Sequence, residues 1–221
     1  MRVAVTGTPG VGKTTATESL STDLDVLHLN DLVREAGLTE GTDEARGSLV
    51  VDLEAVSARL EGHEDLLVES HVAHHLDVDR AIVLRCRPDV LEGRLLDRGE
   101  GETKAAENAE AEALDVILAE TVERRGVDAT YEIDTTDRSV EAVRSDVEAV
   151  LAGDRRPSAG TVDFTGYLVR PTSSGRWPNG GSIPSPARPT GSGQRPTASP
   201  SARSGAPPSP AAPTPAPGTG G

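Results

Sequence analysis

The sequence contains little of what stabilises small secreted proteins or anchors proteins in membranes. It has one cysteine, Cys86, which excludes an internal disulfide and favours a reducing compartment. No apolar run approaches the roughly 18 residues of a membrane span. The apolar strand pattern that begins at Val3 leaves no room for a signal peptide. We therefore expect a soluble, cytoplasmic protein with no membrane partner.

Lysine and aromatic residues are also scarce. Lys13 and Lys104 are the only lysines, and aromatic residues make up 2% of the chain. Acidic residues are abundant, since 36 Asp and Glu stand against 22 Lys and Arg, for a net charge of -14. This composition is typical of halophilic proteins, because concentrated salt screens the repulsion between like charges. An ordinary acidic cytosolic enzyme is the alternative.

The charge is distributed unevenly along the chain. Every acidic residue precedes Val169 and five arginines follow it, so residues 1–168 carry a net charge of -19 and the remainder carries +5. A body of that charge repels phosphate polyanions. We therefore expect no general binding of nucleic acid by the body of the protein.

Residues 169–221 are composed mainly of Pro, Ser, Gly, Thr, Ala and Arg, without a periodic apolar pattern. Such a segment cannot bury enough apolar surface to fold, and we expect it to be disordered. An Arg-bearing tether for RNA or for an acidic partner is one interpretation. A dispensable extension is the other, and the sparse charges favour it.

Short apolar runs alternate with helical patterns over the first 150 residues, which predicts a parallel sheet covered by helices. The expected fold class is α/β, with a five-stranded parallel sheet in a three-layer α/β/α arrangement. We assign residues 1–152 to one domain and residues 153–168 to a short C-terminal extension. The predicted strands are Arg2–Thr6, Val26–Leu29, Asp65–Glu69, Arg80–Arg85 and Thr130–Asp134, and the predicted helices are Thr14–Asp23, Leu53–Glu61, Pro88–Arg98, Ala105–Arg124 and Ser139–Leu151.

A phosphate-binding motif follows the first predicted strand directly. Residues 7–14 read GTPGVGKT, which fits the pattern G-x-x-x-x-G-K-[ST]. Glycines let consecutive amides turn toward phosphate oxygens, the lysine neutralises the terminal phosphates, and the hydroxyl reaches Mg²⁺. The predicted helix after the loop adds unpaired amides and a favourable dipole. The motif thus predicts a P-loop NTPase fold in which Gly10, Gly12, Lys13 and Thr14 bind nucleotide phosphates, and it leaves GTPases, ATPases and small-molecule kinases open. A glycine-rich turn without nucleotide is the alternative.

Two arginines stand four residues apart on the predicted helix that begins at Pro88. Arg94 and Arg98 share one helical face, and two guanidinium groups there can hold the phosphates of a phosphoryl-transfer reaction. A solvated face paired with nearby acids is the alternative. The following Gly99–Glu102 segment predicts a hinge into a short lid, at about residues 97–107, that excludes water. The guanine-reading motif N-K-x-D is absent, so a GTPase is not favoured.

Glu69, Ser70 and His71 end the third predicted strand, at the edge where parallel sheets hold ligands. A carboxylate at Glu69 can hold Mg²⁺ through water, and His71 can orient an attacking oxygen. Alternatively, His71 belongs to a surface trio with His74 and His75. That trio suggests zinc only weakly, because no cysteine accompanies it and two of its histidines are adjacent.

A long polar segment, residues 28–51, follows the second predicted strand. It is too long and too charged for a simple turn, and it stands where nucleoside monophosphate (NMP) kinases insert their acceptor-binding arm. Asp31 and Arg34 are our candidates for contacting the acceptor, with Arg34 on its phosphate. A solvated helix is the alternative.

The motifs, taken in order and spacing, resemble the archaeal adenylate kinase-like family, the nuclear or "isoenzyme six" type. The residues that carry the resemblance are GTPGVGKTT at 7–15, NDLVRE at 30–35, ESH at 69–71, Arg94–Gly99 and KAAEN at 104–108. The resemblance covers roughly residues 1–152. It implies a broad-specificity NMP kinase that takes ATP and AMP, uses Mg²⁺ and also hydrolyses ATP. It further implies a small-subunit ribosomal protein as partner and a role in ribosome maturation.

The resemblance also implies roles for further residues. Thr15 would join the ATP-binding loop, Arg98 would contact the donor phosphates, and the loop 135–138, including Asp137 and Arg138, would lie by the adenine. Glu69 departs from the family pattern, since eukaryotic members carry aspartate there in D-x-H. Glu100 also departs, because a tyrosine usually follows Arg-Gly. A ribosome-assembly ATPase with little kinase activity, and a P-loop kinase of another small metabolite such as dephospho-coenzyme A or shikimate, remain alternative interpretations.

Overall fold

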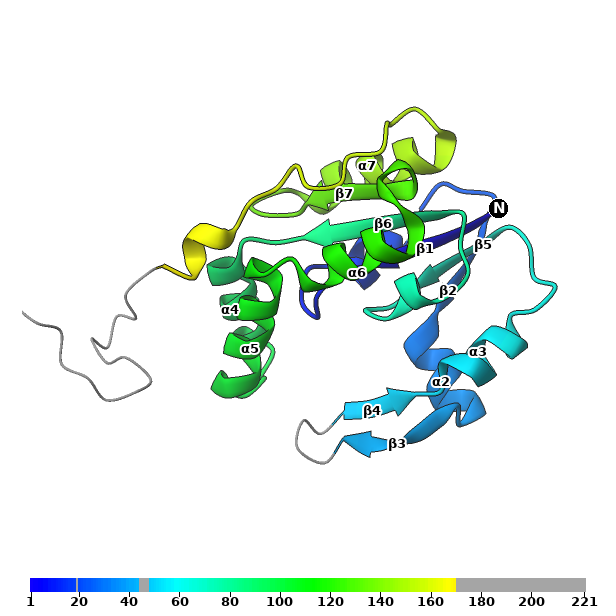
Figure 1. The fold of residues 1–221 in the computed structure, drawn as a ribbon, viewed down its shortest axis with the longest axis horizontal. Coiled ribbons are helices and arrows are strands. Elements are labelled where there is room, and N and C mark those ends of the chain that lie inside the picture. Colours follow the sequence, from blue (N-terminus) through cyan, green and yellow to red (C-terminus); the bar gives the residue numbers. More distant parts are fainter. Residues whose placement is uncertain (19, 44–47, 170–221) are drawn as a thin grey trace, which may run out of the picture. The chain divides into compact units, whose positions relative to one another are not determined.

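A five-stranded parallel sheet forms the centre of the protein (Figure 1). The computed structural model describes residues 1–18, 20–43 and 48–169, and the expected disorder of the tail lies outside them. The strand order is β2-β5-β1-β6-β7, which places the strand before the phosphate-binding motif in the middle. The strands are β1 (Arg2–Thr6), β2 (Asp25–His28), β5 (Leu66–Glu69), β6 (Arg80–Arg85) and β7 (Thr130–Asp134), so all five predicted strands are confirmed.

Helices cover both faces of this sheet, and its inner strands are buried almost along their whole length. Val3 and Val5 of β1 pack into one cluster with α1, α4 and α7, whereas Ala4 packs into a second cluster with α2, α3 and η1. The expected three-layer α/β/α architecture is therefore present. The helices are α1 (Lys13–Thr17), α2 (Leu29–Ala36), α3 (Leu53–Arg59), α4 (Pro88–Asp97), α5 (Glu102–Ala113), α6 (Val116–Arg125) and α7 (Val140–Ala152), with 3-10 turns η1 (Ala73–His75), η2 (Val127–Ala129) and η3 (Thr165–Tyr167).

None of the helices in the described part of the chain combines the length and the apolar character that a membrane span needs.

Two predicted helices differ from the observed ones. The helix expected over residues 14–23 ends at Thr17, because the backbone of the next residue, Glu18, is already extended, with ψ of 128°. The helix expected over residues 105–124 is two helices, α5 and α6. They are separated at Asp115, which has a left-handed φ of 55° and whose carboxylate accepts a hydrogen bond from the Arg85 guanidinium. A tertiary ion pair therefore outweighs the local helical preference.

The segment expected to form the acceptor arm is folded where the structure describes it. It consists of α2 and an antiparallel pair of strands that the sequence analysis did not predict, β3 (Thr39–Asp43) and β4 (Ser48–Val51). Residues 44–47 lie outside the described part. The expected lid at residues 97–107 contains the turn between α4 and α5 and the first half of α5, and these two helices pack side by side (Figure 1).

Residues 153–168 pack on the folded unit. The Thr161 and Val162 amides donate to Glu132 Oε2, at 2.6 and 3.1 Å, and the Phe164 ring lies 5.4 Å from the Arg85 guanidinium carbon. The Tyr167 hydroxyl donates to Glu92 at 3.1 Å. The C-terminal segment thus closes over buried charges of β6 and β7.

One buried histidine links the sheet to α6. His74 is 1% exposed, and its two ring nitrogens lie 3.0 Å from Thr6 Oγ1 and 3.0 Å from Glu120 Oε2. Burial lowers the pKa of His74 from 6.5 to about 4. As pH falls, the unfolded chain therefore takes up this proton before the folded chain does. Stability that is present above about pH 6.5 is lost as the pH falls toward about 4.

We expect His74→Gln to reduce the loss of stability in acid. Between pH 7 and pH 5 the wild type should lose about 2 kcal/mol more unfolding free energy than the variant, because glutamine does not take up a proton. Urea unfolding at both pH values measures this difference. His63→Gln, at an exposed position, serves as the control and should behave like the wild type. Equal acid sensitivity of His74→Gln and wild type would contradict this assignment.

Candidate active site

The loop between β1 and α1 is held close to neighbouring backbone by its glycines. Gly7 has φ of 136°, and a Cβ atom there would lie 2.3 Å from the Leu84 carbonyl oxygen of β6. Gly10 has φ of 94°, and its Cβ would lie 2.8 Å from Leu91 Cδ1 of α4. Only glycine fits both positions without strain. The strand–loop–helix context predicted for residues 7–14 is therefore present.

The amides of this loop lead into a very short helix. Gly12, at φ of 100°, precedes α1, and nothing lies within 4 Å of where its Cβ would be. The first amides of a helix have no acceptor within it, so those of Lys13, Thr14 and Thr15 are suited to an anion. Because α1 has five residues, its dipole is small. Binding of an anion at this loop would therefore depend on the nearby backbone amides more than on the dipole of the longer helix that the sequence analysis expected.

Lys13 is buried at the centre of the loop. Its Nζ donates to the carbonyl oxygens of Gly7 and Thr8, at 2.8 and 3.2 Å. Burial lowers its pKa from 10.5 to about 8, while Glu69 and Glu112 favour the charged form. The ammonium group thus lies in a pocket of carbonyl and carboxylate oxygens.

Glu69 brings two elements together beside the loop. Its side chain is buried, its Oε2 accepts a hydrogen bond from the Thr14 hydroxyl at 3.2 Å, and His28 Nδ1 lies 3.0 Å from the same oxygen. The sequence analysis placed Thr14 and Glu69 together but did not single out His28. The parallel register, in which His28 of β2 pairs with Glu69 of β5, accounts for the contact.

His71 follows Glu69 on the same edge of the sheet and is partly buried. Burial lowers its pKa, and the nearby Lys13 charge lowers it further. A neutral imidazole is therefore favoured next to the loop.

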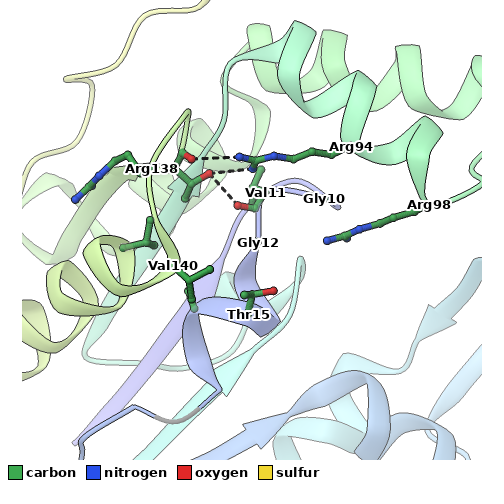
Figure 2. A pocket seen from close by; sticks show the side chains of 11 residues that line it. Gly10, Val11, Gly12, Thr15, Arg94, Arg98, Arg138 and Val140 are labelled. Atoms are coloured by element: carbon green, nitrogen blue, oxygen red, sulfur yellow. Dashed lines mark hydrogen bonds between the residues drawn. The ribbon is translucent and has the colours of Figure 1, made fainter.

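An open pocket extends from the loop toward α4 and α7 (Figure 2). Arg94 Nη2 donates to the Thr135 carbonyl oxygen at 3.3 Å, so this guanidinium is held against the β7–α7 loop. Arg98 extends from the end of α4 toward the glycine-rich loop, and its charge lowers the pKa of Lys13. Within the described residues, the Arg98 guanidinium forms no hydrogen bond or ion pair, and only its backbone amide donates, to Leu95. The pocket is lined by Gly10, Val11, Gly12, Thr15, Ala16, Arg94, Arg98, Thr135, Arg138, Val140 and Val143.

The loop 135–138, expected beside the adenine, contributes polar side chains, and the neighbouring helix α7 contributes apolar ones. The Arg138 guanidinium donates to Asp146, at 2.6 Å, and to the main-chain oxygens of Ala142 in α7 and Asp134 in β7. Figure 2 shows its side chain directed away from Arg94. Asp137 is exposed and lies 3.4 Å from Arg87. Val140 and Val143 of α7 also line the pocket on this side. The sequence analysis did not select them, because a valine on an amphipathic helix indicates core packing.

The acceptor candidates lie on α2, apart from this pocket. Asp31 and Arg34 are both exposed, and Arg34 Nη1 lies 3.6 Å from Asp31 Oδ1. Exposed pairs of this kind contribute little to stability. The Arg34 side chain is thus available to a ligand without a large loss of protein contacts.

The histidine trio divides in the structure. His74 and His75 approach Glu120 of α6, with the His75 Nε2 to Glu120 Oε2 distance 3.8 Å, and the three ligand atoms lie within 4.8 Å of one another. The sequence analysis did not find Glu120, which is distant along the chain. His74 is already satisfied by Thr6 and Glu120. We therefore assign the cluster a structural role.

Comparison with known proteins first identifies the class of protein to which this domain belongs. The AAA domain family matches residues 3–115, which contain the glycine-rich loop, Glu69 and both pocket arginines. The chain thus contains a P-loop NTPase domain.

More similar relatives define the family. The chain is 63% identical over 168 residues to a "Putative adenylate kinase" of Natronomonas pharaonis, covering 76% of this chain and 100% of the relative. It is 43% identical over 170 residues to the protein of that name from Methanothermobacter thermautotrophicus, covering 76% and 99%. The chain therefore belongs to the archaeal adenylate kinase-like family, which supports an NMP kinase-like function. Among solved structures, shikimate kinase from Bacteroides thetaiotaomicron matches with a TM-score of 0.41 and 19% identity, over 69% of this chain and 98% of that one.

Gly7→Ala should destabilise the protein by roughly 2–4 kcal/mol, because the added methyl group meets the Leu84 carbonyl and φ is unfavourable. Gly93→Ala, in α4 with open space around it, is the matched control and should stabilise by about 0.5–1 kcal/mol. Urea unfolding measures both changes. If Gly7→Ala unfolds at the same urea concentration as the wild type, the close approach of loop and β6 is wrong.

Proposed function

We propose that the protein transfers the γ-phosphoryl group of ATP to AMP and forms two molecules of ADP. The observation that carries the proposal is that Arg94 and Arg98 line one pocket with a loop of the P-loop pattern. The buried lysine of that loop, Lys13, is close enough to Arg98 for the Arg98 charge to lower its pKa. Lys13 and Arg98 repel each other in the absence of an anion, so a triphosphate between them would relieve that repulsion. This arrangement suits phosphoryl transfer, in which charge stabilisation and positioning supply most of the catalysis.

In the proposed reaction, an AMP phosphate oxygen attacks the γ-phosphorus and the bond to the β–γ bridging oxygen breaks. The loop amides and Lys13 would bind the β- and γ-phosphates, and Arg98 with Arg94 would stabilise the transferring group. Arg34 would bind the acceptor phosphate, with Asp31 beside it. His71, as a neutral imidazole, would orient the acceptor. No covalent enzyme intermediate is needed.

The residues near Thr14 fit a magnesium ion. The Thr14 hydroxyl and the Glu69 carboxylate supply neighbouring oxygen atoms, which are the ligands that Mg²⁺ prefers. When bound, Mg²⁺ would neutralise charge on the β- and γ-phosphates. Thr14 would be a direct ligand and Glu69 would act through a water molecule. His28, on the same carboxylate oxygen, would fix the orientation of Glu69.

The apolar surface of Val140 and Val143 supports binding of the adenine ring between α7 and the loop. Thr15 would line this site. We propose that Arg138 and Asp137 contact the edge of the adenine ring. For this, the Arg138 side chain must break its hydrogen bond to Asp146, or Arg138 must contact the base through its main chain.

We also propose ATP hydrolysis and a role in small ribosomal subunit maturation in the cytoplasm, on the basis of the family resemblance. The net charge of -19 over residues 1–168 favours a basic ribosomal protein, and not bare RNA, as the partner. The same charge suits a protein that works in concentrated salt. An assembly ATPase would turn over ATP when the partner is added and would use AMP poorly, so assays with AMP, CMP or no acceptor discriminate between the functions.

Lys13→Ala should abolish both AMP phosphorylation and ATP hydrolysis, with losses of at least about a hundredfold in turnover, because the variant lacks the charge on the terminal phosphates. The fold should persist, since alanine removes a buried charge. Coupled assays of ADP formation, with circular dichroism on the same samples, measure both. Unchanged turnover would refute the assignment of the loop.

Arg34→Ala should raise KM for AMP about tenfold or more and leave KM for ATP within about twofold, because a charged hydrogen bond to the acceptor is lost. Arg59→Ala, which removes another exposed arginine, in α3, is the control and should change neither constant. Equal effects of Arg34→Ala on ATP and AMP would argue against α2 as the acceptor site.

A further inference from the structure

A buried arginine lies at the end of β6, next to the glycine-rich loop. Arg85 is 1% exposed and contacts three carboxylates, those of Glu112, Asp115 and Glu132. Burying this many charges is costly unless each oxygen has a hydrogen-bond donor. The cluster was not apparent from the sequence, because its acids come from α5, the α5–α6 junction and β7.

Glu112 has donors on both of its oxygens. Its Oε1 accepts from Arg85 Nε at 2.7 Å and from the Cys86 amide at 3.1 Å. Its Oε2 accepts from the hydroxyl of Thr8, the second residue of the phosphate-binding motif. A carboxylate can only accept, so the Thr8 hydroxyl must donate to it and its rotamer is fixed. Both side chains are buried, at 3% exposure each.

Thr8 in turn contacts the functional part of the loop through its main chain. The Thr8 carbonyl oxygen accepts from Lys13 Nζ at 3.2 Å and from the Val11 amide at 3.3 Å. Displacement of Thr8 would therefore move the lysine and the bend that precedes Gly12. A short chain of hydrogen bonds thus joins Arg85, Glu112 and Thr8 to the loop.

We propose that Glu112, oriented by Arg85, is a positioning residue that holds the phosphate-binding loop in its nucleotide-binding conformation by fixing the Thr8 hydroxyl. The inference rests on the proposed function, in that the loop must bind ATP for its position to matter. Glu112 itself touches no substrate in this account. Its positioning effect on ATP passes through Thr8, and its charge also favours the charged form of Lys13. Thr8→Val removes the first effect alone.

Glu132 provides a matched control for a purely structural role. It contacts the same guanidinium and is 1% exposed, but its second oxygen binds the Thr161 and Val162 amides and not the loop. If the cluster only stabilises the fold, Glu112→Gln and Glu132→Gln should change the affinity for ATP equally. If Glu112 positions the loop, only its substitution should weaken ATP binding at equal stability.

The experiment measures the affinity for ATP in the presence of Mg²⁺ by isothermal titration calorimetry on the full chain, together with melting temperatures. Thr8→Val and Glu112→Gln should each lower the affinity for ATP roughly fivefold to tenfold. The double variant should have an affinity within about twofold of that of the single variant that binds ATP less tightly, because both substitutions break the same hydrogen bond. Thr8→Ser, which keeps the hydroxyl, should bind as the wild type does. Glu132→Gln should stay within about twofold of the wild type.

Several results would overturn the inference. Wild-type affinity in folded Thr8→Val, additive losses in the double variant, or equal losses in Glu112→Gln and Glu132→Gln would each do so. If Glu112→Gln does not fold, Thr8→Val and Thr8→Ser still decide, because the first replaces the hydroxyl with a methyl group and the second keeps the hydroxyl. Failure of the wild type to bind ATP would instead overturn the proposed function.

Discussion

The close approach of one loop to the backbone of β6 is the constraint on which the site depends. Gly7 lies where a side chain would collide with the Leu84 carbonyl, and Gly10 lies against the leucines of α4. This packing fixes the bend of the chain between β1 and α1, from which the first amides of α1 extend. The arginines reach the same point because α4 follows β6 directly and packs against the loop. The geometry of sheet, loop and helix therefore concentrates positive charge in a protein that is otherwise strongly acidic.

Buried charge supports this arrangement from behind. Lys13 is surrounded by oxygen atoms, and Arg85 links β6, α5 and β7 beneath the loop. The C-terminal segment completes the cluster, because the amides of Thr161 and Val162 satisfy Glu132. Residues 153–168 thus contribute hydrogen bonds to the folded unit. The electrostatic cost of burying these groups is offset by hydrogen bonds that also fix the positions of the elements.

Local sequence patterns predicted the central sheet and the phosphate-binding loop. Short apolar runs such as β1 and β6 are recognisable because both faces of the strand are buried. Features that depend on distant residues were not predictable. Asp115 interrupts a helical pattern only because Arg85 binds it, and His28 meets Glu69 only through the strand register. The antiparallel strands β3 and β4 lie within the polar segment 28–51, and their sequences have only weak apolar alternation. Val140 and Val143 line the pocket although valine on an amphipathic helix indicates core packing.

The central claim is that the amides of residues 10–14 surround the phosphates of a nucleotide. The most direct test is the change in backbone amide chemical shifts when ATP and Mg²⁺ are added to ¹⁵N-labelled protein at high ionic strength. We predict that the largest changes occur at Gly10, Gly12, Lys13 and Thr14, with small changes in residues 153–168. Saturable shifts confined to another surface, or no shifts in a folded sample, would contradict the account.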